Sequence, residues 1–539
     1  MAIMERRARW LCVALLAAVL GSAPGHVDVA RAEDAPSPPQ GAGSRAEEAR
    51  LLKEQGDEYE SQDRHAEAIV AYRAAIAADP SLVPEVETSL GTSLLWADRT
   101  EEAVKVLSSA AARNPDDLET RKLLARGYRW SDRLDEAERL SRRNLSEDPG
   151  DAEERVGLAT ALLWQGKDRE AAAEFRRALD TQPGDGEALL GLSRSLMEMD
   201  LPEQAEDYAA RAAALDPKNE AAAKHLGTVR RRLARYVEGE ISGSYDTDQL
   251  TLWKMSLGAH SRPARGLDVG VVATELLFRQ GSPGKQENIG EVDSADGTAG
   301  AVTFAYRSGP SWVLRGSAGV TRYDVADFHP WTGSAGGTYF HGDLWRFALD
   351  WDRAPYDTIL SLQNRVTIDS VSATVTRAIP WKTEVTASAA YLMERNDNDT
   401  GQPRSNSGQR YELGLSRRLY MKDEVTRLTG LLRMGYLGYR YDLDVGVYDP
   451  LRQTTEEVGI DGRWAFRPRW EAFGTAMVGA QQENGAGGSP TYSLEAGVDR
   501  EVGAAGRVTL GAFTAESAAA GRGEGYRRYG GYLRFRVPF

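Results

Sequence analysis

The charged side chains of the C-terminal half are the first candidates for chemistry, because they recur at every second position. In segment 344–354, Arg346, Asp350 and Asp352 alternate with large apolar residues. Carboxylates and guanidinium groups held in such a row can attract and steer a polar, hydrated solute. Mutual pairing of these charges is the simpler interpretation at any single position. The remaining candidates for solute contact follow the same alternation: Glu238, Glu240, Glu384, Glu412, Asp461, Arg463, Arg534 and Arg536.

The sequence predicts no catalytic set, metal site or cofactor site. After residue 32, the histidines are scattered and lack metal-ligand spacing: His65, His225, His260, His329 and His341. The chain contains no GxSxG nucleophile elbow and no Walker phosphate loop. Cys12 is the only cysteine, so a cysteine nucleophile and a disulfide are excluded from the chain after residue 32. We therefore expect a protein that is not an enzyme.

The elements that would position these charges are β-strands. From Tyr236 to the end of the chain, sixteen segments alternate between apolar and polar residues. Such alternation suits a strand between lipid and a polar lumen. Short connections, such as 308–310 and 341–343, alternate with mostly longer ones, such as 280–296. A soluble β-sandwich gives no reason for this alternation. Residues 236–539 are therefore predicted to form an antiparallel transmembrane β-barrel of about 16 strands, with its short turns in the periplasm.

The last segment, Tyr526 to Phe539, is predicted to close this barrel. It places Leu533, Phe535 and Val537 on one face and arginines on the other. Closure requires it to pair with the first strand near Tyr236, which removes both sheet edges. Pro538 cannot donate a backbone hydrogen bond, so it should lie where no partner is needed. The terminal Phe539 is similar to the C-terminal signal that barrel-assembly machinery reads, which implies that machinery as a partner.

The N-terminus has the features of a secretory signal peptide. Residues 1–32 combine a basic start, an apolar run from Trp10 to Leu20 and small residues before the end at Ala32. A membrane anchor would need a longer apolar core. Residues 33–48 are predicted to be a flexible linker, because their first part is rich in proline and glycine.

Residues 49–217 contain five repeats of a helical unit. The markers recur at intervals of 34 or 35 residues, with each alanine twelve residues before its proline. These are Pro80, Pro115, Pro149, Pro183 and Pro217, with Ala68, Ala103, Ala137, Ala171 and Ala205. This pattern resembles the tetratricopeptide repeat, a helix–turn–helix unit in which small residues let two helices approach and proline ends the second helix. Residues 218–235 are predicted to form a capping helix with a basic end.

Three tryptophans also recur every 34 residues, at Trp96, Trp130 and Trp164. Each lies near the predicted end of the first helix of its repeat. Packing at the helix turn is the simpler role, and a stacking platform for a peptide or a glycan is the alternative. The repeats offer a face for partners, and the formal net charge of −14 argues against nucleic acid as one of them.

A signal peptide, repeats of this kind and a C-terminal barrel together resemble the exopolysaccharide export porins of Gram-negative bacteria. That group includes exporters of poly-N-acetylglucosamine, cellulose and Pel, and the related YaiO-type proteins. The resemblance implies an outer-membrane location in contact with lipid, periplasmic repeats that dock a polysaccharide or a protein, and transport of a biofilm polymer to the cell surface. Two alternatives stay open: an adaptor or surface-display protein whose repeats recruit a partner protein, and a plugged barrel that is only an anchor.

Overall fold

The computed structural model describes residues 42–247, 249–281, 292–379, 382–397, 403–421, 426–443, 447–485, 488–503, 506–517 and 526–539. The predicted signal peptide, 1–32, and residues 33–41 of the predicted linker lie outside the described residues. The chain divides into two compact units, one up to Arg99 and the other from Thr100 to Phe539.

The first unit consists of helices α2 (Ala42–Ser61), α3 (His65–Ala78), η1 (Pro80–Leu82) and α4 (Val83–Trp96). The Tyr72 ring of α3 packs onto Gly56 of α2, where a Cβ atom would lie within 2.5 Å of the ring. Glycine is therefore required for the close approach of these two helices. The Tyr72 hydroxyl donates to Asp57 at 2.9 Å, which ties the same pair together.

The second unit begins with helices that continue the 34-residue pattern. They are α5 (Thr100–Arg113), α6 (Leu118–Trp130), α7 (Leu134–Glu147), α8 (Ala152–Gln165), α9 (Asp168–Thr181), α10 (Gly186–Glu198), α11 (Pro202–Leu215) and α12 (Glu220–Leu233). The side chains of Asp117, Asp151, Asp185 and Asn219 accept backbone N–H bonds at the starts of α6, α8, α10 and α12. These N-caps recur every 34 residues. Each repeat proline in this unit lies two residues beyond the preceding helix, where it stops helix extension.

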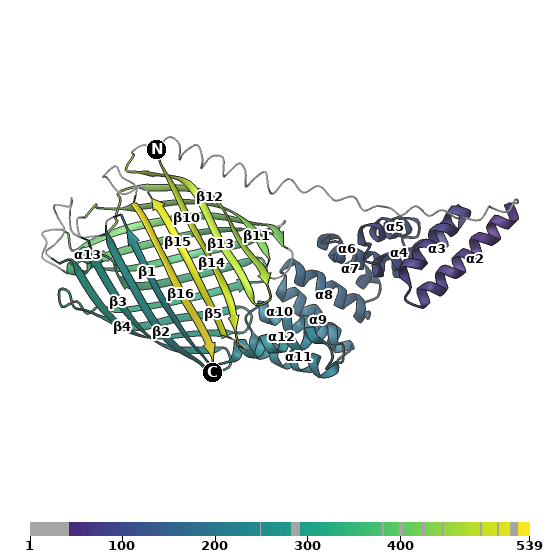
Figure 1. Ribbon diagram of the computed structural model, residues 1–539, viewed down its shortest axis with the longest axis horizontal. Coiled ribbons are helices and arrows are strands. Elements are labelled where there is room, and N and C mark those ends of the chain that lie inside the picture. Colours follow the sequence, from purple (N-terminus) through teal and green to yellow (C-terminus); the bar gives the residue numbers. More distant parts are fainter. Residues whose placement is uncertain are drawn as a thin grey trace. The chain divides into compact units, whose positions relative to one another are not determined.

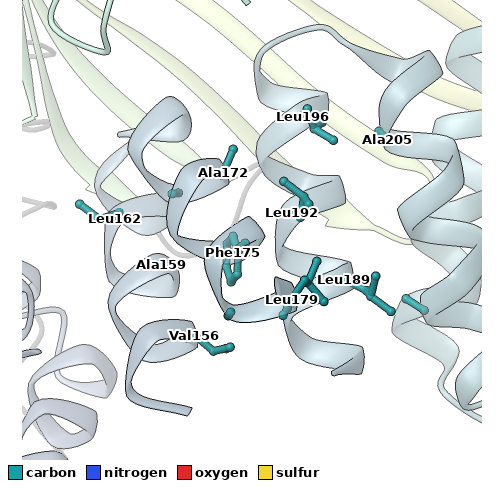
Figure 2. Packing of buried hydrophobic residues seen from close by; sticks show 14 of the residues in the cluster. Val156, Ala159, Leu162, Ala172, Phe175, Leu179, Leu189, Leu192, Leu196 and Ala205 are labelled. Atoms are coloured by element: carbon teal, nitrogen blue, oxygen red, sulfur yellow. The ribbon is translucent and has the colours of Figure 1, made fainter. Parts of the chain in front are cut away.

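The core of these repeats is a continuous cluster of small and aliphatic side chains around one aromatic ring (Figure 2). Phe175 of α9 is 1% exposed and packs onto Gly191 of α10. The predicted packing alanines Ala137, Ala171 and Ala205 are fully buried. Because the alanines are small, the two helices of each repeat approach closely and leave room for the ring. No helix in the described part of the chain is long and apolar enough to span a membrane.

Sixteen antiparallel strands follow and form a closed barrel (Figure 1). They are β1 (Tyr236–Asp246), β2 (Leu250–Ala264), β3 (Leu267–Gln280), β4 (Ser294–Ser308), β5 (Trp312–Tyr323), β6 (Trp331–His341), β7 (Trp345–Pro355), β8 (Thr367–Ile379), β9 (Thr383–Arg395), β10 (Ser405–Met421), β11 (Arg427–Tyr439), β12 (Gln453–Arg467), β13 (Trp470–Glu483), β14 (Ser489–Val502), β15 (Gly506–Ser517) and β16 (Tyr526–Pro538). The predicted fold class, helical repeats followed by a sixteen-stranded antiparallel barrel, is confirmed.

The barrel closes between β1 and β16, with Tyr236 opposite Pro538. The Phe539 N–H donates to the Arg235 carbonyl at 2.9 Å. Successive N–H groups of a strand point to opposite sides, so the missing N–H of Pro538 faces the β15 side. The pairing of β15 with β16 starts only at Arg507 and Arg536, so no partner is lost. A role for Phe539 in assembly stays a prediction.

The two faces of the barrel wall differ in chemistry. Large apolar side chains at alternate positions are strongly exposed, for example Leu349 (62%) and Leu510 (63%). The opposite positions carry charged groups that join strands two apart, such as Arg463 on β12 with Asp499 on β14. Side chains converge on the concave side of a closed sheet, so these contacts identify the inner face. The apolar outer face and polar inner face are those of an outer-membrane-type barrel.

Candidate functional site

The predicted solute-contact residues all occupy inner-face positions, on β1, β7, β9, β10, β12 and β16. The positions follow from the strand alternation: Glu412 lies between the exposed outer-face residues Tyr411 and Leu413, and Asp461 lies next to Ile460. The inner face thus carries both signs of charge. Contact of these residues with a solute stays a prediction.

Many of these charged side chains form hydrogen bonds with other side chains of the barrel wall. Arg534 donates to Glu240 at 2.7 Å, which links β16 to β1. Arg315 donates to Asp350 at 2.7 Å. Arg463 donates to Glu471 and to Asp499, both at 2.9 Å. The structure therefore pairs these residues with inner-face residues one or two strands away, including the predicted pair Arg534 and Glu240, and does not gather them in a single cluster.

Further inner-face residues make similar local contacts. The Thr475 hydroxyl donates to Asp461 at 2.9 Å, and Asp352 accepts from Ser370. His260 Nε2 lies 3.2 Å from Glu238 Oε1. The Arg536 guanidinium lies 3.4 Å from the centre of the Tyr236 ring. Among the described residues, no group of three or more His, Cys, Asp or Glu is placed to hold a metal ion.

The barrel also supplies the missing N-cap of a repeat helix. Helix α9 begins after Lys167, which provides no side-chain cap. Instead Asp343, in the turn between β6 and β7, accepts from the backbone N–H groups of Arg169 (3.0 Å) and Glu170 (3.1 Å). The Arg169 side chain donates to the same carboxylate at 3.2 Å and to the Pro310 carbonyl at 2.6 Å. A negative group at a helix N-terminus is favourable, so this contact fixes the repeats to the barrel rim.

Three further ion pairs extend this junction along the rim. Asp132, in the turn after α6, lies 3.3 Å from Lys382 in the β8–β9 turn. Asp200, in the turn after α10, lies 3.5 Å from Arg307 at the end of β4. Glu203 at the start of α11 lies 3.2 Å from Arg262 near the end of β2. Successive repeat turns therefore meet successive short turns of the barrel in order.

We expect Asp343→Ala to loosen this junction. The substitution removes the cap of α9, which typically stabilises a helix by about 1 kcal/mol, and leaves Arg169 without its carboxylate. Amide hydrogen exchange at Arg169 and Glu170 should therefore accelerate by about five- to tenfold. Asp185→Ala is the matched control, because it removes the cap of α10 within the repeats. It should accelerate exchange at the start of α10 only. Unchanged exchange at the start of α9 in Asp343→Ala would contradict the capping role.

A cavity of about 160 Å³ lies beside this junction. Its lining includes Asp168 and Glu198 from the repeats and Arg346 and Glu384 from the inner face of the barrel. Burial, together with the negative charges of Glu198 and Asp343, raises the pKa of Asp168 to about 7. The cavity therefore joins the repeats to the barrel mouth and contains a carboxyl group that titrates near neutral pH.

The raised pKa of Asp168 predicts that its contribution to the stability of the second unit falls as the pH rises. An unperturbed aspartate has a pKa of about 3.9. Between that value and about 7, the folded state holds a proton that the unfolded state has released. This contribution to the free energy of unfolding therefore falls across the interval and levels off above it. Thermal unfolding at several pH values should show a weaker decline in Asp168→Asn than in the wild type.

The control for this pH effect is Asp180→Asn, at an exposed position of the same helix. This variant should keep the wild-type pH dependence. Identical pH profiles for Asp168→Asn and the wild type would show that Asp168 does not set the pH response of the junction.

At the opposite end of the barrel, the connection between β7 and β8 folds against the inner face. Residues 356–366 contain a short helix, α13 (Ile359–Gln363). Ile359 and Leu362 are buried against Phe278 of β3 and Tyr323 of β5. Burial raises the pKa of Asp357 above its ordinary value, although the nearby positive charges of Lys254 and Arg528, on β2 and β16, oppose the rise. These contacts place the segment inside the barrel.

The same segment reaches the connection between β11 and β12. Tyr356 and Val366 pack with Leu443 and Val447. The Tyr356 hydroxyl accepts from the Tyr448 N–H at 3.3 Å, and the Tyr448 hydroxyl donates to Glu483 of β13 at 2.9 Å. We call residues 356–366, together with 443 and 447–449, the internal bridge. It extends from the β2–β5 side of the interior to β13, at the end of the barrel away from the repeats.

Sequence reasoning did not identify the internal bridge, Asp343 or Asp168. The apolar residues Ile359, Leu360 and Leu362, in a connection between two strands, are the signal that could have revealed the bridge. Asp343 lies in a His-Gly-Asp turn like many surface turns, so its capping role had no sequence signal.

Comparison with known proteins agrees with the helical repeats. The tetratricopeptide repeat family matches residues 60–127 and 165–228, so these segments are tetratricopeptide repeats. No curated protein matches the chain. One solved structure, a bacterial polysaccharide outer membrane secretin, is 15% identical, with 56% of this chain and 98% of that chain covered and a TM-score of 0.45. MamA is 19% identical over 32% of this chain and 93% of its own, with a TM-score of 0.29. YrrB, a tetratricopeptide repeat protein with an unusual peptide-binding site, is 17% identical over 33% of this chain and 91% of its own, also with a TM-score of 0.29.

Proposed function

We propose that this protein is an outer-membrane exporter that passes a polysaccharide from the periplasm to the cell surface. The repeats act as a periplasmic docking platform for the polymer or for a protein that delivers it. The observation that carries this proposal is the junction at the short-turn rim, where a cavity is lined by repeat residues and by the inner-face residues Arg346 and Glu384. A polymer held by the repeats would therefore enter the barrel directly.

The barrel interior supports transport of a polar solute. Barrels of 16 to 18 strands leave room for an aqueous channel, and the inner face here carries charges of both signs. Because many of these charges pair with each other, the wall as a whole should not strongly attract a highly charged solute of either sign. A hydrated polymer with little net charge fits such a lining. Membrane lipid and the barrel-assembly machinery are its other proposed partners, and no cofactor is required.

Deletion of the gene, followed by measurement of surface polysaccharide, tests the proposal. Loss of surface polymer, with periplasmic accumulation, is the expected result. Complementation with a variant that carries Glu240→Gln, Asp350→Asn and Asp461→Asn together tests the inner-face carboxylates. Normal surface polymer in the deletion strain would overturn the export function, and normal export by the variant would overturn the role of these carboxylates.

The internal bridge is the observation that favours a second function. A barrel obstructed by its own chain would serve as an anchor, with the repeats recruiting a protein partner. Conductance of the purified protein in a planar bilayer distinguishes the two functions. An exporter should show openings that allow ions through, whereas a permanent anchor should remain closed under all applied voltages.

A further inference from the structure

The first helices of two successive repeats, α6 and α8, present a common face. Arg126 of α6 donates to Glu153 of α8 at 2.5 Å, so these two positions lie on adjoining surfaces. Trp130 follows Arg126 by four residues, which is about one helical turn. Trp164 follows Glu153 by eleven residues, which is about three turns. Both tryptophans therefore lie on the face that the ion pair identifies.

The two indole rings are exposed on this face. Trp130 is 41% exposed and Trp164 is 43% exposed, whereas tryptophan is usually highly buried. Helices α6 and α8 contact each other directly, and packed helices lie about 8–10 Å apart. The two rings therefore project from neighbouring helices and occupy equivalent positions along one surface. Trp96 occupies the same repeat position in the preceding repeat.

The same repeat position leads to the barrel mouth. Glu198 of α10 lies 34 residues after Trp164, and it lines the cavity that also contains Arg346 and Glu384. Asp132, two residues after Trp130, contacts the rim at Lys382. A chain lying across the two rings and continuing in the same direction would thus reach the barrel interior.

The basic side chains on this face are paired with carboxylates. Lys122 pairs with Asp151 at 2.9 Å, and Arg126 pairs with Glu153. With these charges paired, the surface around the rings offers little attraction to a strongly charged ligand. An aromatic ring with an N–H group binds a ligand that has both an apolar face and hydrogen-bonding groups. A pyranose ring has a face of C–H groups and a rim of hydroxyl groups, so it meets both requirements.

We propose that Trp130 and Trp164 form a stacking track that binds an uncharged polysaccharide and leads it to the barrel mouth. The inference rests on the proposed export function and specifies the sugar-binding residues within it. Each ring stacks on the C–H face of one sugar unit, while hydroxyl groups remain in contact with water. This face is therefore a binding surface in addition to its role in repeat packing.

Binding of oligosaccharides to the purified full chain in detergent tests the track. The probes are cellohexaose and chitohexaose, which are uncharged, and an alginate hexasaccharide, which is anionic, with calorimetry as the readout. We expect the wild type to bind at least one uncharged probe more tightly than the anionic one. The double variant W130A/W164A should bind about tenfold more weakly or worse, because aromatic stacking is the main contact. The conservative W130F/W164F should restore part of the affinity.

Leu215→Ala, at an exposed position of α11, is the control and should bind as the wild type does. Equal affinities of W130A/W164A and the wild type, no binding of either uncharged probe by the wild type, or preference for the anionic probe would each overturn the track. The export function is judged separately by surface polysaccharide in the deletion strain. Loss of polymer in that strain, with normal export by W130A/W164A, would leave export intact and reject only the track.

Discussion

Removal of the internal bridge should convert the barrel into a wider pore. Replacement of residues 357–365 by a short glycine–serine linker removes α13 and its buried residues Ile359 and Leu362 from the interior. We expect the single-channel conductance in a planar bilayer to rise severalfold, because the narrowest part of a channel sets most of its resistance. The variant should also admit larger neutral solutes in a liposome-swelling assay.

The strands that flank the bridge should tolerate this change. β7 and β8 pair along their whole length without help from the connection, so the barrel should still assemble and resist unfolding in detergent. The matched control is Leu349→Ala, on the outer face of β7, which should leave the conductance unchanged. A bridge-free barrel with wild-type conductance would show that the bridge does not limit the channel.

Phe175→Ala should destabilise the repeats more than any other single substitution considered for this chain. The ring is 1% exposed and fills the space between α9 and α10. Truncation of a buried phenylalanine costs about 3–5 kcal/mol of unfolding free energy, because burial is lost and a cavity remains. In a denaturant titration of the full-length variant, the spectroscopic signal of the helices should therefore disappear at a lower denaturant concentration than in the wild type. The signal of the barrel strands should be retained.

Two variants control this measurement. Leu215→Ala truncates a side chain that is 54% exposed, so it should change stability by less than about 0.5 kcal/mol. Phe175→Leu keeps most of the buried volume and should fall between the two. If Phe175→Ala and Leu215→Ala unfolded at the same denaturant concentration, the ring would not be the centre of the repeat core.

Local patterns were sufficient to predict the architecture. The repeat prolines lie just beyond helices because proline cannot continue a helix, and this effect depends on the local chain alone. The alternation around Trp345 and Arg346 likewise reflects the period of a strand. Both patterns can be recognised within a short segment, without knowledge of distant residues. The fold class and the inner-face positions of the charged residues were therefore accessible from the sequence.

The contacts that organise the site depend on distant residues and were not accessible. Arg463 bonds to Asp499 only because the strand register brings β12 and β14 together on one concave face. Asp343 caps α9 from a turn 174 residues away in the chain. The path of residues 356–366 depends on apolar partners on β3 and β5. No periodicity within a single segment specifies such pairings.

The order of contacts along the rim has a consequence for how proteins of this design can evolve. Along the rim, one repeat occupies about the thickness of a packed helix pair. One barrel hairpin occupies two strand spacings of about 4.8 Å each. Asp132 and Asp200 therefore meet rim residues of different hairpins from equivalent repeat positions. Insertion of a hairpin within β2–β9 would displace every later contact, so that part of the barrel is constrained. Whole repeats added before Asp132 would leave the contacts between the repeats and the rim intact. The number of repeats can therefore change during evolution while the pore stays the same.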